Sequence, residues 1–196
     1  FISLKNSQTL FYSGIEKRNS SLEVFLRFKS ARSHSGVLPV TVLTSPGEFS
    51  CPKDCHFCPD ERDVNGKRVQ PRSYLSSEPA CKRADQNDFD PILQFFDRCD
   101  TLQKIGHVID KVEVLVLGGT WSFYKSEYQY EFCRRIFYCA NIYWDIQDTL
   151  SSGKPFFLRK MNSLEEEQNI NESSRCRIIG ITLETRPDYI TKTEIK

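Results

Sequence analysis

Three short apolar runs rich in β-branched residues alternate with two stretches of helical periodicity, and this alternation constrains the fold more than any other feature. The apolar runs cover residues 37–45, 111–121 and 176–184, and the helical patterns cover residues 90–107 and 125–146. Strands that alternate with helices are joined by right-handed crossovers into a parallel sheet. The runs are apolar on both faces, which is typical of parallel strands covered by helices on both sides. The sequence therefore predicts an α/β fold.

Capping residues indicate where the helices begin and end. Asp90 is a predicted N-cap, Pro91 suits the first helical position, and Gly106 suits the end of the same helix. Ser126 is the predicted cap of the second helix. Residues 163–173 are acidic, and they predict a short helix that faces solvent.

The number of strands indicates an incomplete barrel. A full (β/α) barrel takes about 250 residues, whereas this chain has 196 residues and three predicted strands. We therefore expect a partial TIM-like (β/α) barrel of three strand–helix units, with a long polar loop at residues 60–79. The first residue is Phe rather than Met, so the chain is expected to begin inside a longer protein.

Composition and charge narrow the class of protein. Hydrophobic residues make up 39% and charged residues 27% of the chain, which predicts a globular protein. No apolar run of about 18 residues is present, so no transmembrane helix is predicted. The net charge is only +1, but residues 1–36 carry six Lys or Arg against two Glu. Such a segment either contacts phosphate or is simply solvated.

The eight cysteines are unevenly distributed along the chain. Three cluster within residues 51–58, and the other five lie apart, mostly inside apolar patterns. Secreted proteins instead spread cysteines through a disulfide framework. The distribution predicts a cytoplasmic protein with a metal site and buried free thiols. The dispersed cysteines are Cys81, Cys99, Cys133, Cys139 and Cys176.

The clustered cysteines have the spacing C-x3-C-x2-C, through Cys51, Cys55 and Cys58, directly after the first predicted strand. Thiolates at this spacing can reach one metal centre from a single tight loop. A structural zinc site needs a fourth protein ligand, for which Cys81 is the candidate. A [4Fe–4S] cluster held by three cysteines leaves one iron open for a substrate. Spacing favours the cluster but leaves both metals open, and Phe57 is either loop packing or the wall of a cofactor pocket.

Polar stretches also follow the other two predicted strands. Gly118, Gly119 and Thr120 follow the second strand, and Glu184 and Arg186 follow the third. In parallel α/β folds the carboxyl ends of the strands meet at the edge where active sites form. Glycines there allow backbone groups to approach a ligand closely, although they also suit a simple turn. The Glu–Arg stretch suits either a cofactor contact or a structural ion pair.

The cysteine motif, with an aromatic residue before its last cysteine, resembles the signature of radical S-adenosylmethionine (radical-SAM) enzymes. Longer stretches resemble one family, that of the Elongator catalytic subunit, whose members are radical-SAM and acetyltransferase enzymes of the tRNA wobble uridine. These stretches are SGVLPVTVLTSP, SYLSSEP, FDPILQ, GHVIDKVEVLVLGGTWSFY and GITLETRPDY. The resemblance runs from about Arg32 to Tyr189, and the first cysteine gap resembles the prokaryotic branch more than the eukaryotic one.

The resemblance implies a set of ligands. The three clustered cysteines would ligate a [4Fe–4S] cluster whose open iron binds S-adenosyl-L-methionine. The Gly-Gly-Thr stretch would lie against the methionine end of that cofactor. Lys111 matches a lysine associated with acetyl-CoA, although by itself it is an ordinary solubilising residue. The implied metal ligands are Cys51, Cys55 and Cys58, and the implied cofactor contacts are Phe57, Lys111, Gly118, Gly119, Thr120, Glu184 and Arg186.

The resemblance also implies an activity and a domain organisation. The enzyme would form 5-carboxymethyluridine at the wobble position of tRNA from acetyl-CoA, as an acyltransferase, with or without Elongator-like subunits. Residues 1–31 would be a basic segment that contacts tRNA phosphate, and residues 32–196 the N-terminal half of the radical-SAM core. The family's C-terminal acetyltransferase domain is absent from the chain, so activity is expected of the longer protein rather than of these residues alone.

Three alternatives remain open from the sequence. The first is another radical-SAM enzyme, such as a methylthiotransferase or a cofactor-biosynthesis protein. The second is a non-catalytic zinc-binding module with Cys81 as the fourth ligand. The third is a scaffold that has kept the fold without the chemistry.

Overall fold

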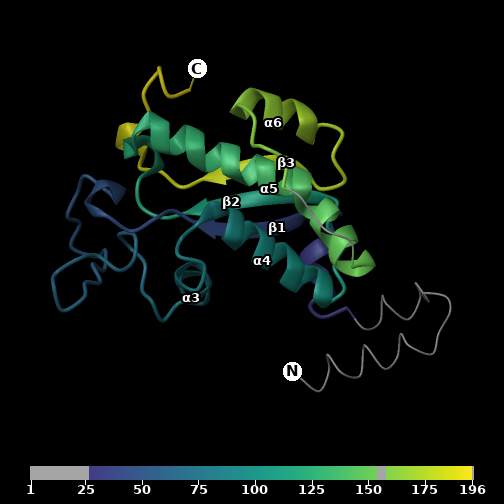
Figure 1. Ribbon diagram of the computed structural model, residues 1–196. Coiled ribbons are helices and arrows are strands. Elements are labelled where there is room, and N and C mark those ends of the chain that lie inside the picture. Colours follow the sequence, from purple (N-terminus) through teal and green to yellow (C-terminus); the bar gives the residue numbers. More distant parts are fainter. Residues whose placement is uncertain (1–26, 154–157, 196) are drawn as a thin grey trace.

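Three parallel strands form the sheet at the centre of the structure (Figure 1). The computed structural model describes residues 27–153 and 158–195, so most of the basic N-terminal segment lies outside the described residues. The strands are β1 (Leu38–Leu43), β2 (Lys111–Leu117) and β3 (Arg177–Leu183), in the order β1-β2-β3. The predicted parallel α/β fold is confirmed, and each observed strand is shorter than the apolar run that predicted it.

In the part of the chain that the structure describes, four α-helices connect and cover the strands. Among the described helices, none has both the length and the hydrophobicity that a membrane span requires. The helices are α3 (Pro79–Asp85), α4 (Pro91–Lys104), α5 (Ser126–Ser152) and α6 (Leu164–Asn171). Three of the described helices, α4, α5 and α6, were expected at these places, but α5 continues beyond residue 146, α6 buries Glu167 and Asn171 instead of facing only solvent, and α3 was not expected.

Local hydrogen bonds fix the starts of the helices. The Asp90 side chain accepts hydrogen bonds from the backbone N–H groups of Ile92 at 2.9 Å and Leu93 at 3.1 Å, so the predicted N-cap is confirmed. The prediction that Ser126 caps α5 was wrong. Ser126 is the first helical residue, because the extended cap conformation falls on Lys125, which makes no side-chain capping bond.

The main core lies between the sheet and the helices α4 and α5, which pack against each other and against the strands. The face of the sheet that carries Val40 and Val114 is buried, whereas the alternate residues of β1 and β2 are mostly half-exposed. At the end of that second face, α3 covers Leu43 and Leu117. The expectation of helices along both faces therefore holds only at this end of the sheet.

The dispersed cysteines belong to these packed regions. Cys81, Cys99, Cys139 and Cys176 are buried free thiols, as predicted, while Cys133 is half-buried. Burial raises the pKa of the Cys81 and Cys133 thiols to about 11. These side chains therefore stay protonated and act as small apolar groups at neutral pH.

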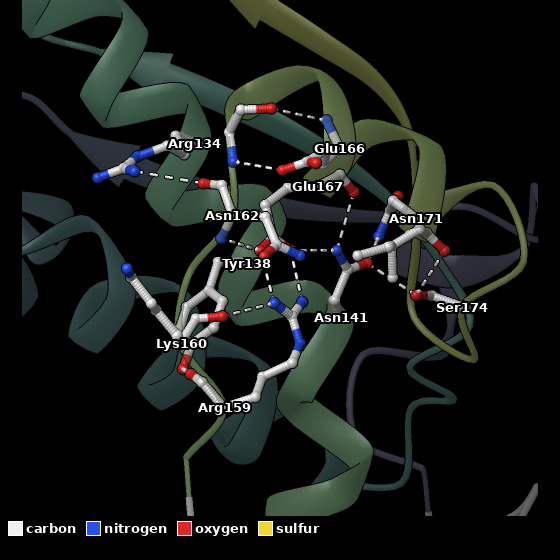
Figure 2. Close-up of polar contacts among 12 residues, drawn as sticks. Arg134, Tyr138, Asn141, Arg159, Lys160, Asn162, Glu166, Glu167, Asn171 and Ser174 are labelled. Carbon is white, nitrogen blue, oxygen red and sulfur yellow. Dashed lines mark hydrogen bonds and ion pairs between the residues drawn. The ribbon is translucent and has the colours of Figure 1, made fainter.

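A buried carboxylate attaches α6 to α5 (Figure 2). Glu167 is fully buried and accepts hydrogen bonds from Arg159 Nη1 at 2.6 Å, the Asn162 backbone N–H at 2.9 Å and Asn141 Nδ2 at 2.8 Å. Burial alone would raise the pKa of this carboxyl group, but the Arg159 guanidinium and the other donors bring it below its ordinary value. The segment after α5 is thus fixed by one ionised side chain.

The end of α6 also sets the start of β3. Asn171 Nδ2 donates to the Asn141 side chain at 2.7 Å (Figure 2). The same Nδ2 donates to the Cys176 carbonyl at 3.0 Å, and Asn171 Oδ1 accepts from the Ile178 N–H at 2.8 Å. β3 pairs only with β2 among the described strands, and Ile179 on it is 54% exposed. The outer margin of β3 therefore has no strand partner in the described part of the chain.

Candidate functional site

The segments that follow the carboxyl ends of all three strands line one cavity of about 430 Å³. The strands end together because of their register, in which Leu43 lies opposite Leu117 and Val116 lies opposite Leu183. The expectation that the three polar stretches share one edge of the sheet is confirmed. Of the residues predicted from the sequence, the cavity brings together Cys51, Cys55, Cys58, Gly119, Thr120, Glu184 and Arg186.

The Gly-Gly turn allows the cysteine loop to cross the end of β2. Gly119 has a φ of +42°, and a Cβ at this position would overlap the Ser50 carbonyl oxygen, which accepts a hydrogen bond from the Thr120 N–H at 2.7 Å. Gly118 has a φ of +123°, and a Cβ there would overlap the Thr44 hydroxyl. The protein itself therefore makes the close approach at both glycines, through the Ser50 backbone carbonyl at Gly119 and the Thr44 side chain at Gly118.

Each of the three clustered thiols has a partner on the cavity wall. Cys55 Sγ accepts a hydrogen bond from Arg186 Nη1 at 3.1 Å. Cys58 Sγ accepts one from the Ser73 hydroxyl at 3.0 Å. The third, Cys51 Sγ, lies 3.3 Å from Thr120 Oγ1. All three cysteines are half-buried, so solvent and ligands can reach them.

The donor chemistry of the cavity fits a thiolate-bound metal centre. Three thiols face one space, and the Cys58 N–H donates to the Cys55 carbonyl at 3.1 Å, which closes the tight turn that C-x2-C ligation uses. Within residues 27–153 and 158–195, no three His, Cys, Asp or Glu side chains already have the arrangement of a metal site. The sulfurs line the same cavity but must converge when they bind a metal.

Cys81, the proposed fourth zinc ligand, lies elsewhere. It lies on α3 and is fully buried in a small cluster with Leu43, Ala84 and Phe89. It is not among the residues that line the cavity of the three clustered cysteines. The described structure therefore does not bring a fourth thiol to this cavity.

A group of charged residues beside the cysteine loop was not predicted from the sequence. The Asp60 carboxylate pairs with Arg68 at 2.6 Å, Arg62 at 2.8 Å and Arg72 at 2.9 Å. Hydrogen bonding to Arg68 outweighs burial and, with Arg62, lowers the pKa of Asp60 to about 2, so this carboxylate is ionised at neutral pH. The only signal in the sequence was the recurrence of arginine in a loop that otherwise resembled a solvated connection.

Glu184 and Arg186 do not pair with each other. The Tyr74 hydroxyl donates to the Glu184 carboxylate, and burial together with this bond raises the pKa of Tyr74 above its usual range. Arg186 pairs with Asp188 at 2.8 Å and also reaches Cys55. The long loop and the end of β3 are therefore connected beside the cavity.

Two other candidates lie away from the cavity. Lys111 is the first residue of β2, at the opposite edge of the sheet, and its nearest acidic group is Asp110 at 3.9 Å. Phe57 is 93% exposed and contacts the edge of the His56 ring, with 5.4 Å between the ring centroids. Neither residue lines the space that the three cysteines share.

No protein-family model matches the chain. Comparison with curated proteins instead finds relatives whose names agree with one another. The tRNA uridine(34) acetyltransferase of Methanocaldococcus infernus is 38% identical over 97% of this chain and 32% of its own length. Elongator complex protein 3 of Drosophila melanogaster is 34% identical over 87% of this chain and 28% of its own length.

A solved structure agrees with these sequence matches. The archaeal Methanocaldococcus infernus Elp3 with an N-terminal deletion superposes with a TM-score of 0.53 and 29% identity, over 82% of this chain and 25% of that one. The chain spans about a third of the length of the relatives it matches. Over nearly its whole length it is therefore homologous to the family of tRNA uridine(34) acetyltransferases and Elongator complex protein 3 proteins.

Proposed function

We propose that this chain is part of a radical-SAM enzyme that modifies the wobble uridine of tRNA with acetyl-CoA as co-substrate. One observation carries the proposal: three thiols at C-x3-C-x2-C spacing share a cavity with Gly119, Thr120 and Glu184 at the carboxyl edge of a parallel sheet. The names of the relatives add the substrate, because they identify a uridine of tRNA and an acetyl transfer. Residues 32–196 would form the N-terminal half of the catalytic core.

The proposed roles follow from the positions of the side chains. Cys51, Cys55 and Cys58 would hold a [4Fe–4S] cluster, which when bound supplies reductive cleavage of S-adenosyl-L-methionine. The Gly119–Thr120 turn would shape the wall against which the cofactor lies. Glu184, fixed by its bond to Tyr74, would offer a carboxyl oxygen to a ligand in the same cavity.

The remaining parts of the reaction involve larger substrates. The acetyl group of acetyl-CoA would become the carboxymethyl group of 5-carboxymethyluridine, and the uridine must leave its stack to be reached. Lys111 would contact acetyl-CoA only from the other edge of the sheet, outside the cavity. A tRNA substrate and unpaired thiols both favour the cytoplasm. The enzyme would act either alone or with further Elongator-like subunits.

The proposal is tested with the complete protein that carries this chain. After anaerobic reconstitution with iron and sulfide, we expect about four irons per chain and 5′-deoxyadenosine when S-adenosyl-L-methionine and a reductant are added. With tRNA and acetyl-CoA, mass spectrometry of nucleosides should detect 5-carboxymethyluridine. Cleavage with a different tRNA product would identify another radical-SAM enzyme. Zinc in place of iron, with colourless protein and no cleavage, would contradict the proposal.

Replacement of Cys55 by alanine should abolish both iron binding and cofactor cleavage, because two thiolates cannot hold the cluster. Cys81→Ala is the matched control, since it removes a thiol outside the cavity. It should lower stability through a small core void but leave the iron content unchanged. Iron content after reconstitution and 5′-deoxyadenosine yield are the measurements. Loss of metal in Cys81→Ala with retention in Cys55→Ala would reverse the ligand assignment.

A further inference from the structure

We propose that Arg72 is a positioning residue that holds the cysteine loop ready to bind its metal. The inference rests on the proposed metal site and adds a residue that the sequence motif does not include. Arg72 lies in the long loop after the cysteines and reaches back to line their cavity.

One guanidinium contacts both flanks of the C-x2-C turn. Arg72 forms an ion pair with Asp54, directly before Cys55, and its Nη2 also donates to the Cys55 carbonyl at 3.4 Å. Its Nη1 lies 2.9 Å from Asp60, two residues after Cys58. Arg72 therefore fixes the distance between the two ends of the turn that presents two of the three thiols.

The burial of the two partners indicates what the ion pair does. The Arg72 side chain is 6% exposed, whereas the side chain of Asp54 is 91% exposed. Ion pairs that involve a solvent-exposed carboxylate contribute little to global stability. The Asp54 contact therefore acts on the local conformation of the cysteine loop rather than on the free energy of unfolding.

Arg72 also has one buried N–H donor that lacks a hydrogen-bond partner. Among the residues that the structure describes, only two buried side-chain polar atoms lack a hydrogen-bond partner, and these are Arg72 Nε and Gln70 Oε1. A buried N–H group without a partner is costly.

The test uses cadmium as a probe of the three thiolates in the complete, metal-free protein. Cd²⁺ binding is followed by thiolate charge-transfer absorbance, which does not depend on activity. Side chains that orient metal ligands typically change metal affinity by about 10- to 100-fold. We expect a loss in this range for Arg72→Lys, because an ammonium cannot contact Asp54, Asp60 and the Cys55 carbonyl together.

Asp54→Asn is the second variant, because a change at so exposed a side chain leaves the fold intact. It should weaken cadmium binding in the same direction as Arg72→Lys, and the two effects should not add in the double variant. Arg62→Lys is the matched control, since Arg62 also pairs with Asp60 but is not a cavity-lining residue; its affinity should stay near wild type.

The outcomes separate the inference from the proposed function. Wild-type affinity in both Arg72→Lys and Asp54→Asn would overturn the role of Arg72 while leaving the metal site standing. Absence of cadmium binding by the wild-type protein would overturn the metal site and this inference with it. Loss of affinity in Arg72→Lys and Asp54→Asn, with an unchanged urea midpoint for the latter, would establish the positioning role.

Discussion

Replacement of Gly119 by alanine is expected to destabilise the protein by at least about 2 kcal/mol and to abolish iron binding. The left-handed backbone of this residue costs alanine about 1 kcal/mol, and overpacking of a tight site adds about 1–3 kcal/mol. The new methyl group would overlap the Ser50 carbonyl oxygen, which is backbone and cannot rotate away. Ser50 must therefore move, and Cys51 moves with it.

Two measurements check this expectation. Urea unfolding gives the change in stability of the chain, and iron content after reconstitution of the complete protein gives the change at the site. Gly36→Ala is the matched control, because Gly36 also has a positive φ, +78°, but has open space around it. It should cost about 1 kcal/mol and leave iron binding unchanged. Normal iron binding by Gly119→Ala would show that the Ser50 contact does not set the position of the first cysteine.

Replacement of Glu167 by glutamine is expected to destabilise the chain by about 2 to 3 kcal/mol at neutral pH. Four donors from Arg159, Asn162 and Asn141 converge on the two carboxylate oxygens, and a glutamine amide would direct its own N–H groups at them. The estimate lies below that for a fully buried pair, because Arg159 is 35% exposed and water can solvate it once the carboxylate is gone.

The effect of Glu167 depends on pH. Its pKa in the folded protein lies below the ordinary value of 4.5, so the stabilisation is complete above the unfolded pKa and is lost as pH falls through the folded pKa. The difference between wild type and Glu167→Gln in urea unfolding should be constant above about pH 5.5 and shrink below about pH 4.5. Glu165→Gln, on the exposed face of the same helix, should change stability by less than about 0.5 kcal/mol. A pH-independent difference would contradict the role of the ionised carboxylate.

Local sequence patterns were sufficient for the three strands, for three of the four described α-helices and for the edge at which the site forms. The β-branched apolar runs were sufficient to predict the three strands. Asp90 followed by Pro91 predicted a helix start that the structure confirms. Ser126 was misassigned because a serine before a helical pattern fits either the cap or the first turn. The helix at Pro79–Asp85 was missed because its apolar residues are too few to show a period.

The environment of the cysteines could not be predicted from local patterns. Arg72 reaches Asp54 across 18 residues of loop, and no spacing rule indicates which arginine of a polar loop folds back. The bond between Tyr74 and Glu184 joins residues 110 positions apart. Such pairs depend on tertiary packing. The second face of the sheet is half-exposed for a similar reason, because the apolar composition of a strand does not show which helices will cover each of its faces.

The outer margin of β3, which has no strand partner in the described part of the chain, affects how this chain behaves when it is purified alone. A strand that carries exposed apolar side chains such as Ile179, and whose outer margin has no strand partner among the residues that the structure describes, is a template for other extended chains. Molecules crowded together would pair at that margin by intermolecular strand addition, so dilution and a charged substitution at Ile179 should both favour monodisperse samples.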